Sequence, residues 1–272
     1  MPDNGCTFQY YPSLDFLRDA HLLLPFDRNT ARCINHPNQM KKLLTLLLFV
    51  GVVYSCSNSN IEQQNSEIDF TAHQFTYKDL TLPYRKGEVG VGNNRILILY
   101  LHGGSSKGDD NLSQLGEPAI FTIAKYLQNN NFVADIIVPQ CPTDKSWGKS
   151  LNNTLKALIE QFNYTKLYLF GGSMGGTGIW EFISAYPALV TAAMPVAGNP
   201  SICNANNIAQ SAIYTVVGSE DKQSTIDAVT EFVAQLQILG ANIRFDIENG
   251  WGHAQSCTDS YTDARLSWVF GF

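Results

Sequence analysis

Short apolar runs alternate with longer stretches of helical period from residue 68 to residue 272. Five runs are apolar at nearly every position, which is typical of strands that are buried on both faces of a parallel sheet. They cover residues 95–101, 134–138, 166–170, 192–196 and 212–217. A further strand is expected at 243–248, and two half-buried edge strands are expected at 69–77 and 80–85.

The segments between these runs place their apolar side chains on one helical stripe. One stripe is Leu151, Leu155, Leu158, Ile159 and Phe162, and a second is Ile226, Val229, Val233 and Leu236. The alternation predicts one α/β domain over residues 68–272, with a mainly parallel, doubly wound sheet covered by helices on both faces. Ligands of such sheets bind beyond the carboxyl ends of the strands, so the loops there are the places to look for chemistry.

The first 67 residues follow a different pattern. Met40, Lys41 and Lys42 precede an apolar run of eleven residues, 43–53, which is too short to span a bilayer and has the features of a secretory signal. Residues 53–56 resemble the lipobox of bacterial lipoproteins, in which the cysteine at the cleavage site carries the lipid. We therefore expect lipidation at Cys56; a plain cleaved signal peptide is the alternative.

These features predict a division of the chain into four parts. Residues 1–39 are expected to be an over-extended upstream leader, 40–55 a lipoprotein signal peptide, 56–67 a polar tether and 68–272 the catalytic domain. The mature protein is then expected in the bacterial cell envelope, on the periplasmic or cell-surface side, held on the membrane by its lipid anchor.

Charge and cysteine usage narrow the classes of partner. The chain has 18 Lys+Arg against 24 Asp+Glu and no long basic run, so nucleic acid is not an expected partner. No His/Cys cluster has metal-ligand spacing, so neither a metal nor another cofactor is expected. In an oxidising envelope two of Cys141, Cys203 and Cys257 can pair, and we expect Cys203–Cys257 because both follow predicted strands. The sequence does not indicate an oligomeric state.

A glycine-rich turn follows the predicted strand 166–170. Its sequence, Gly-Gly-Ser-Met-Gly-Gly at 171–176, leads into a helical stretch with Ile179 and Trp180. Gly-x-Ser-x-Gly between a buried strand and a helix is typical of a nucleophile elbow, in which flanking glycines permit a strained turn that exposes the serine. Ser173 is therefore the candidate nucleophile. The alternative is a glycine-rich connection that packs tightly or binds a phosphate.

A serine nucleophile needs a general base that is oriented by an acid. His253 is the only histidine after Ser173, and Asp221 follows the strand 212–217, so Ser173, Asp221 and His253 occur in the chain order of α/β-hydrolases. Glu220 is the reserve acid. Asp221 as a helix N-cap and His253 as an ordinary surface residue are the alternatives.

The loop after strand 95–101 can supply the donors for an oxyanion. It begins His-Gly-Gly-Ser at residue 102, and we assign the backbone N–H groups of Gly104 and Met174 to the oxyanion hole, with Ser105 as substitute for Gly104. His102 is expected to brace this loop, and its rival role is that of the catalytic base.

Several motifs together resemble a branch of secreted serine hydrolases that includes the predicted-peptidase group, phospholipase/carboxylesterases, feruloyl and acetyl-xylan esterases, and polyhydroxybutyrate depolymerases. They lie at residues 101–115, 138–142, 146–147, 172–176, 218–221 and 252–253. The resemblance implies an α/β-hydrolase fold and metal-free ester hydrolysis through an acyl-serine intermediate, with Ser173, Asp221 and His253 as catalytic residues. Lys222-Gln-Ser after the acid departs from the family pattern, and the short polar segment 198–210 leaves room for little or no lid.

The function expected from these observations is a serine esterase. Its substrates would be small acyl, acetyl or feruloyl esters, free or linked to polysaccharides, and Trp147 and Trp251 are candidate walls of the substrate pocket or else core aromatics. A serine peptidase of the same fold is one alternative. A non-catalytic surface protein that binds ligands on a hydrolase scaffold is the other.

Overall fold

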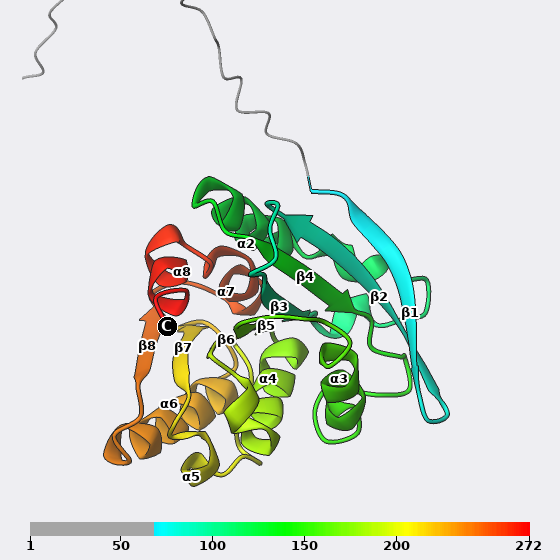
Figure 1. The fold of residues 1–272 in the computed structure, drawn as a ribbon. Coiled ribbons are helices and arrows are strands. Elements are labelled where there is room, and N and C mark those ends of the chain that lie inside the picture. Colours follow the sequence, from blue (N-terminus) through cyan, green and yellow to red (C-terminus); the bar gives the residue numbers. More distant parts are fainter. Residues whose placement is uncertain (1–67) are drawn as a thin grey trace, which may run out of the picture. The chain divides into compact units, whose positions relative to one another are not determined.

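The computed structural model describes residues 68–272 (Figure 1). Their strands form one eight-stranded sheet in the order β1-β2-β4-β3-β5-β6-β7-β8. The strands are β1 (Phe70–Tyr77), β2 (Leu80–Val89), β3 (Ile96–Leu101), β4 (Ala134–Pro139), β5 (Leu167–Gly172), β6 (Ala192–Val196), β7 (Ala212–Gly218) and β8 (Ile243–Glu248). The pairs β1–β2 and β2–β4 are antiparallel, and every pair from β4 to β8 is parallel.

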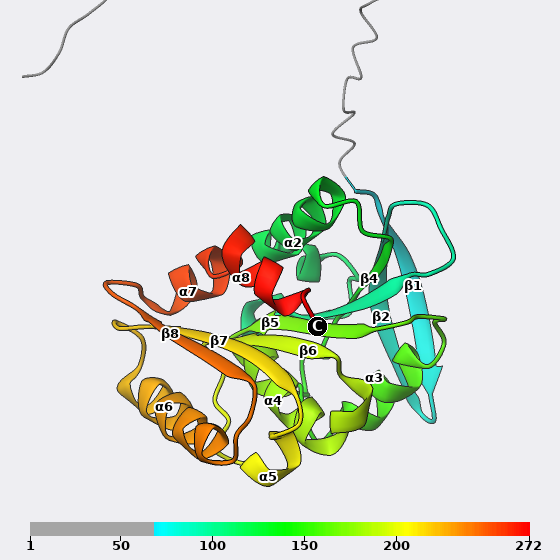
Figure 2. The ribbon, with the colours of Figure 1, turned by 60° about the vertical axis from the view of Figure 1, so that its left-hand side comes forward.

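Helices cover both faces of the sheet, as Figures 1 and 2 show. One face carries α2 (Pro118–Asn129), α7 (His253–Asp259) and α8 (Asp263–Val269), and the other carries α3 (Asn152–Ile159), α4 (Met174–Ala185), α5 (Ala205–Ile208) and α6 (Gln223–Ile238). Three short 3-10 turns complete the described elements: η2 (Gly104–Ser106), η3 (Ser113–Gly116) and η4 (Pro187–Leu189).

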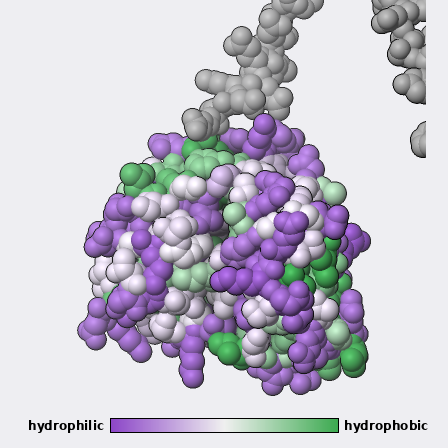
Figure 3. All heavy atoms as spheres, turned by 180° about the vertical axis from the view of Figure 1, so that it is seen from behind, coloured by the Kyte–Doolittle hydropathy of each residue, from purple (hydrophilic) through white to green (hydrophobic). Residues whose placement is uncertain are grey.

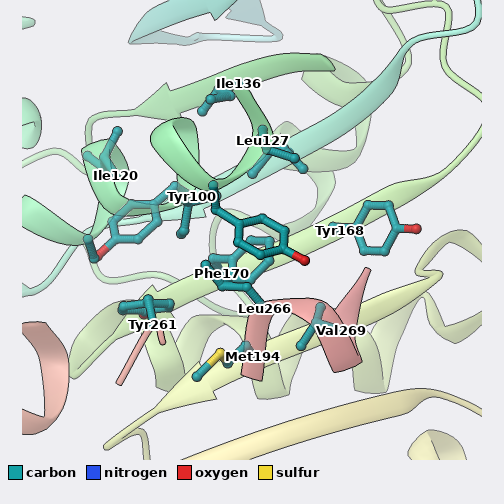
Figure 4. Packing of buried hydrophobic residues seen from close by; sticks show 14 of the residues in the cluster. Tyr100, Ile120, Leu127, Ile136, Tyr168, Phe170, Met194, Tyr261, Leu266 and Val269 are labelled. Carbon is teal, nitrogen blue, oxygen red and sulfur yellow. The ribbon is translucent and has the colours of Figure 1, made fainter. Parts of the chain in front are cut away.

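The central strand β3 shows why the sheet has two cores. All six of its side chains are buried; Ile98 and Tyr100 pack on the α2 and α8 side, and Leu97, Leu99 and Leu101 pack on the α3 and α4 side. Figure 4 shows the first of these cores, where Tyr100 and its aromatic and aliphatic neighbours lie between the sheet and the helices. Since each such side chain stabilises the fold by about 1.5–3 kcal/mol on burial, the apolar run fixes β3 at the centre.

The predicted strands are confirmed to within a few residues at each end. The largest difference is at β2, which continues to Val89 because residues 84–89 pair with β4 in antiparallel register. The segment 198–210 holds only the four-residue helix α5, whose Ala205 and Ile208 are buried in the α4-side core. Little or no lid is therefore formed by the described residues, as expected.

Other predictions fall outside the part of the chain that the structure describes. The upstream leader, the signal peptide, the lipid site at Cys56 and the tether all lie within residues 1–67. Between residues 68 and 272, no helix has the length and hydropathy that crossing a membrane requires.

The expected Cys203–Cys257 disulfide is wrong. Within residues 68–272 the three cysteines Cys141, Cys203 and Cys257 are all free. Cys203 packs against the core on the α3 and α4 side of the sheet, and Cys257 packs against the core on the α2 and α8 side. The two thiols therefore lie on opposite faces of the sheet, where they cannot form a bond.

Candidate active site

Ser173 lies in a strained turn between β5 and α4. Its backbone φ is 57° and its ψ is −120°, and a positive φ is uncommon for a residue other than glycine. A side chain at Gly171 or Gly175 would overlap the carbonyl oxygen of Leu101 on the neighbouring strand. The glycines on both flanks are therefore required for the close approach of this turn to β3. Strain of this kind costs roughly 1–3 kcal/mol and occurs often at functional sites.

Three side chains from different strand ends form one hydrogen-bonded series. His253 Nε2 lies 2.7 Å from Ser173 Oγ, and His253 Nδ1 lies 2.8 Å from Asp221 Oδ2. The Asp221 side chain is fully buried, whereas the His253 side chain is 44% exposed at the start of α7. Because a carboxylate accepts the Nδ1 proton, Nε2 is left as the acceptor for the serine hydroxyl. The structure thus brings together all three residues that the sequence indicated.

Close backbone packing holds the acid in place. Asp221 Oδ1 accepts the Lys222 N–H at 2.6 Å, and the Glu220 N–H donates to Trp251 O at 2.9 Å. A side chain at Gly218 would overlap the same Trp251 carbonyl, so the loops after β7 and β8 can meet only because residue 218 is glycine. The side chain of Glu220, the reserve acid, is exposed and does not contact His253.

Backbone donors flank the serine. The Gly103 N–H donates to Glu117 Oε1 at 2.7 Å, which leaves Gly104 as the first amide of the turn with open space around its Cα. Met174 is the first residue of α4, where amides have no acceptor within the helix. Among residues 68–272 no group accepts a hydrogen bond from the Gly104 or Met174 amide. Both amides therefore remain available to an oxygen placed beside Ser173.

His102 braces the loop that presents Gly104. It is completely buried; its Nε2 accepts the Cys141 N–H at 2.9 Å and its Nδ1 donates to Gly103 O at 2.6 Å. Burial lowers the pKa of His102 to about 4, so the ring is neutral at pH 7. Both ring nitrogens are occupied by backbone groups, and the rival role of His102 as catalytic base is excluded.

Two polar side chains whose roles the sequence did not indicate, Glu117 and Gln140, hold the same loop. Glu117 Oε1 accepts both the Gly103 N–H and the Ser106 hydroxyl. Buried Gln140 donates to Ser106 O at 3.3 Å and to Asp110 Oδ1 at 2.7 Å. A glutamate before Pro118 resembles an ordinary acid at a helix start, and the motif at 138–142 does not indicate what Gln140 contacts, so only the tertiary contacts identify their roles.

Trp147 does not line a pocket, which corrects one of the two aromatic expectations. It is 3% exposed, and its Nε1 donates to His102 O at 2.9 Å. Its ring packs edge-on against the His102 ring, with the centroids 5.1 Å apart. The indole therefore supports the His102 loop from within the core. Trp251 is partly exposed and lies two residues before His253, so it remains a candidate for contact with a ligand.

The described residues contribute three side chains and two backbone amides to the site. No three His, Cys, Asp or Glu side chains gather closely enough to hold a metal ion anywhere in residues 68–272. A serine hydroxyl bonded to a histidine that is oriented by a buried carboxylate, with two free amides beside it, is the arrangement that nucleophilic acyl transfer requires.

Comparison with solved structures identifies the architecture as the α/β-hydrolase fold. A thermostable esterase superposes with a TM-score of 0.68 at 23% identity, covering 75% of this chain and 63% of its own length. The feruloyl esterase module from Clostridium thermocellum, complexed with sinapinate, gives 0.58 at 13% identity, with 75% and 88% covered. Acylaminoacyl peptidase from Pyrococcus horikoshii gives 0.57 at 12% identity, with 82% and 42% covered. No family model and no curated protein matches the sequence.

Proposed function

We propose that this chain is a serine hydrolase that cleaves carboxylic esters through an acyl-serine intermediate. The observation that carries the proposal is the continuous series Ser173–His253–Asp221, with contacts of 2.7 and 2.8 Å, on a turn whose backbone is strained at the serine. A turn held in this conformation exposes the hydroxyl above the sheet, where a substrate can reach it.

The mechanism follows from the positions of the donors. Ser173 Oγ attacks the ester carbonyl carbon while His253 Nε2 takes its proton, and Asp221 stabilises the imidazolium that forms. The Gly104 and Met174 amides donate to the oxyanion, an interaction of about 2.7–4 kcal/mol per donor in such sites. The alcohol leaves with the proton from His253. Water, deprotonated by His253, then attacks the acyl-serine and releases the acid.

Small acyl, acetyl or feruloyl esters, free or linked to polysaccharides, are the proposed substrates. Two observations support this class. The segment after β6 adds only the four-residue α5, so the described residues build little cover over the site. Two structures with this fold are feruloyl or ferulic acid esterases by name, and one of them holds sinapinate, an aromatic acid. Partly exposed Trp251 next to His253 is the proposed contact for such an aromatic group.

Amide cleavage is the second candidate function. The similarity to acylaminoacyl peptidases in fold favours it, and the same nucleophile and base can cleave amides. The matched part covers 42% of those peptidases, so most of each peptidase has no counterpart in the alignment. The ester reaction is therefore the first to test.

We further propose that the chain is lipid-anchored at Cys56 in the bacterial cell envelope. The support is the sequence at residues 40–56, with its basic start, short apolar run and lipobox-like end. The mass of the N-terminal peptide from membrane-fraction protein should show a diacylglyceryl cysteine at position 56. Recovery of the Cys56→Ser variant in the membrane fraction, with its N-terminus at residue 56 as in the wild-type protein, would contradict the proposal.

Initial rates on p-nitrophenyl acetate, methyl ferulate and a peptide p-nitroanilide test the reaction class. Ser173→Ala should reduce ester turnover by more than about 10³-fold without changing the melting temperature. Ser224→Ala, at an exposed position on α6, is the matched control and should be unaffected. Turnover that survives in Ser173→Ala would refute the proposal, and cleavage of the anilide alone would favour the peptidase.

A further inference from the structure

The two edges of the sheet are β1 and β8, and they differ in what they offer a partner. At the edge formed by β8, no other element of the described residues lies beyond the strand in the views of Figures 1 and 2. The exposed side chains of β1 are small or polar, whereas β8 carries the sequence Ile-Arg-Phe-Asp-Ile-Glu. Only β8 combines apolar side chains with charges of both signs.

The backbone of β8 has unused hydrogen-bonding groups on its outer side. The Ile213 N–H donates to Asn242 O and the Ser219 N–H donates to Glu248 O, so the even-numbered residues of this segment bond to β7. In a strand the intervening residues point their N–H and C=O groups the other way. The outward groups of β8 therefore belong to Ile243, Phe245 and Ile247; the Ile243 N–H already donates to Ala241 O at 3.0 Å, so only the C=O of that residue is left for a partner.

One face of this edge is apolar and partly exposed, since Ile243 and Phe245 are half-buried against α6. Ile247 is 48% exposed, and Ile238 and Leu239, at the end of α6 just before β8, are 85% and 44% exposed. These are three of the seven large hydrophobic side chains that are exposed among residues 68–272. Figure 3 shows hydrophobic atoms at the lower right of the view from behind, the side on which α6 and β8 lie. Apolar edges of this kind are usually covered in native proteins.

The other face of the edge is charged, and one charge lacks a partner of opposite sign. Asp246 and Glu248 are both bound by Arg265. Arg244 is exposed and lies over the Trp268 ring at 5.2 Å, and no carboxylate within residues 68–272 pairs with it. The Asp246 side chain is still 37% exposed, so it can accept a second cation.

We propose that a second copy of this chain pairs antiparallel with β8, with Phe245 on the twofold axis. In this register Phe245 faces Phe245, Arg244 of each copy faces Asp246 of the other, and Ile243 faces Ile247. The facing pairs 245–245 and 243–247 are the ones whose backbone groups point outward. The two Phe245 residues exchange both backbone hydrogen bonds, and each Ile247 N–H donates to the Ile243 C=O of the other copy.

Charge and apolar pattern select this register over its neighbours. A shift that centres Asp246 would place two like charges opposite each other, which destabilises a strand pair. In the proposed register both Arg244 side chains gain a carboxylate. The exposed Ile247 of each copy is covered by Ile243, close to Ile238 and Leu239 at the end of α6. The sequence of β8 is thus complementary to itself in the antiparallel direction.

Sedimentation velocity on the full-length chain tests the dimer. The wild-type protein and Val91→Lys, a control at a fully exposed apolar position in the β2–β3 turn, should sediment as dimers at about 100 µM. Ile247→Lys and Arg244→Glu should weaken the dimer at least tenfold, with unchanged circular dichroism. A monomeric wild-type protein, or a dimer that neither variant weakens, would overturn the proposal.

A cysteine at the axis tests the register. Hydrogen-bonded antiparallel pairs have Cα atoms about 5.5 Å apart, within the range of a disulfide. Phe245→Cys should therefore give a 245–245 crosslink on mild oxidation, identified by peptide mass, and Arg244→Cys should not crosslink to itself. A 244–244 crosslink without a 245–245 crosslink would refute the register.

Discussion

His102 and His253 each follow a strand of the same sheet and lie next to glycines, yet their ring nitrogens have different partners. His102 is fully buried and bonds to backbone groups of Gly103 and Cys141. His253 is 44% exposed and bonds to the side chains of Ser173 and Asp221. Backbone partners fix a ring in one protonation state, whereas a hydroxyl and a carboxylate allow it to take up and return a proton.

The difference shows that histidine has two roles in this site: one histidine supports a loop, and the other takes part in the reaction. His102 holds the loop that contains the free Gly104 amide. His253 contacts Ser173, which lies beside this loop. We therefore expect changes at His253 to reduce turnover and leave stability unchanged. Changes at His102 should mainly reduce the free energy of unfolding.

The largest effect is expected for His253→Ala. Loss of the base should lower kcat for ester hydrolysis by about 10⁴-fold or more, since members of such series act as a unit. The free energy of unfolding should change by less than about 0.5 kcal/mol, because the side chain is half exposed. Steady-state rates and urea denaturation of the same preparation check both values. If His253→Ala lost as much unfolding free energy as a His102 variant, the two histidines would not differ in role as proposed.

The next effect is expected for Asp221→Asn. The amide retains the shape of the carboxylate but removes its charge and can select the wrong tautomer of His253, so kcat should fall by about 10³- to 10⁴-fold. Glu220→Gln is the matched control, because the Glu220 side chain is exposed and does not contact His253. Equal losses in the two variants would contradict the assignment of Asp221.

His102→Ala should act on stability. The substitution leaves the buried Cys141 N–H without an acceptor and opens a cavity, which together should cost about 2–4 kcal/mol of unfolding free energy. The expected drop in melting temperature is measurable by calorimetry. Unchanged stability would contradict the bracing role of His102.

The smallest effect is the pH dependence of stability. Because the pKa of His102 is about 4 in the folded protein and near 6.5 in the unfolded chain, the unfolded chain binds more protons between these values. The free energy of unfolding should therefore fall by up to about 3 kcal/mol as pH drops from 6.5 to 4, and this contribution should level off below pH 4. The measurement compares the free energy of unfolding against pH for the wild-type protein and for His102→Gln. The variant should lack the fall that His102 causes, so the two curves should converge as pH drops from 6.5 to 4. Curves that stay parallel would exclude His102 as the source of the fall.

The fold and the reactive residues could be predicted because their signals are local. Strands buried on both faces need unbroken apolar runs, as in β3, and a strained serine needs glycines beside it, as at Gly171 and Gly175. The choice between Asp221 and Glu220 was harder, since adjacent acids in one turn differ only in the direction of their side chains. The contact with His253 decides it.

The errors concern features that depend on which face of the sheet a loop reaches. Cys203 and Cys257 both follow strands, but they pack on opposite faces. Trp147 precedes a glycine near the site, yet its indole turns into the core to meet His102. Glu117 was missed because its bond to the Gly103 amide joins segments that no motif links.

Fluorophosphonate labelling tests the central claim most directly. The full-length wild-type protein, His253→Ala and His102→Gln are treated with the reagent, and the adduct is located by peptide mass spectrometry. We predict one adduct, on Ser173, that forms at similar rates in wild type and His102→Gln and at least 10³-fold more slowly in His253→Ala. No adduct on folded wild-type protein, or equal labelling of His253→Ala, would contradict the account.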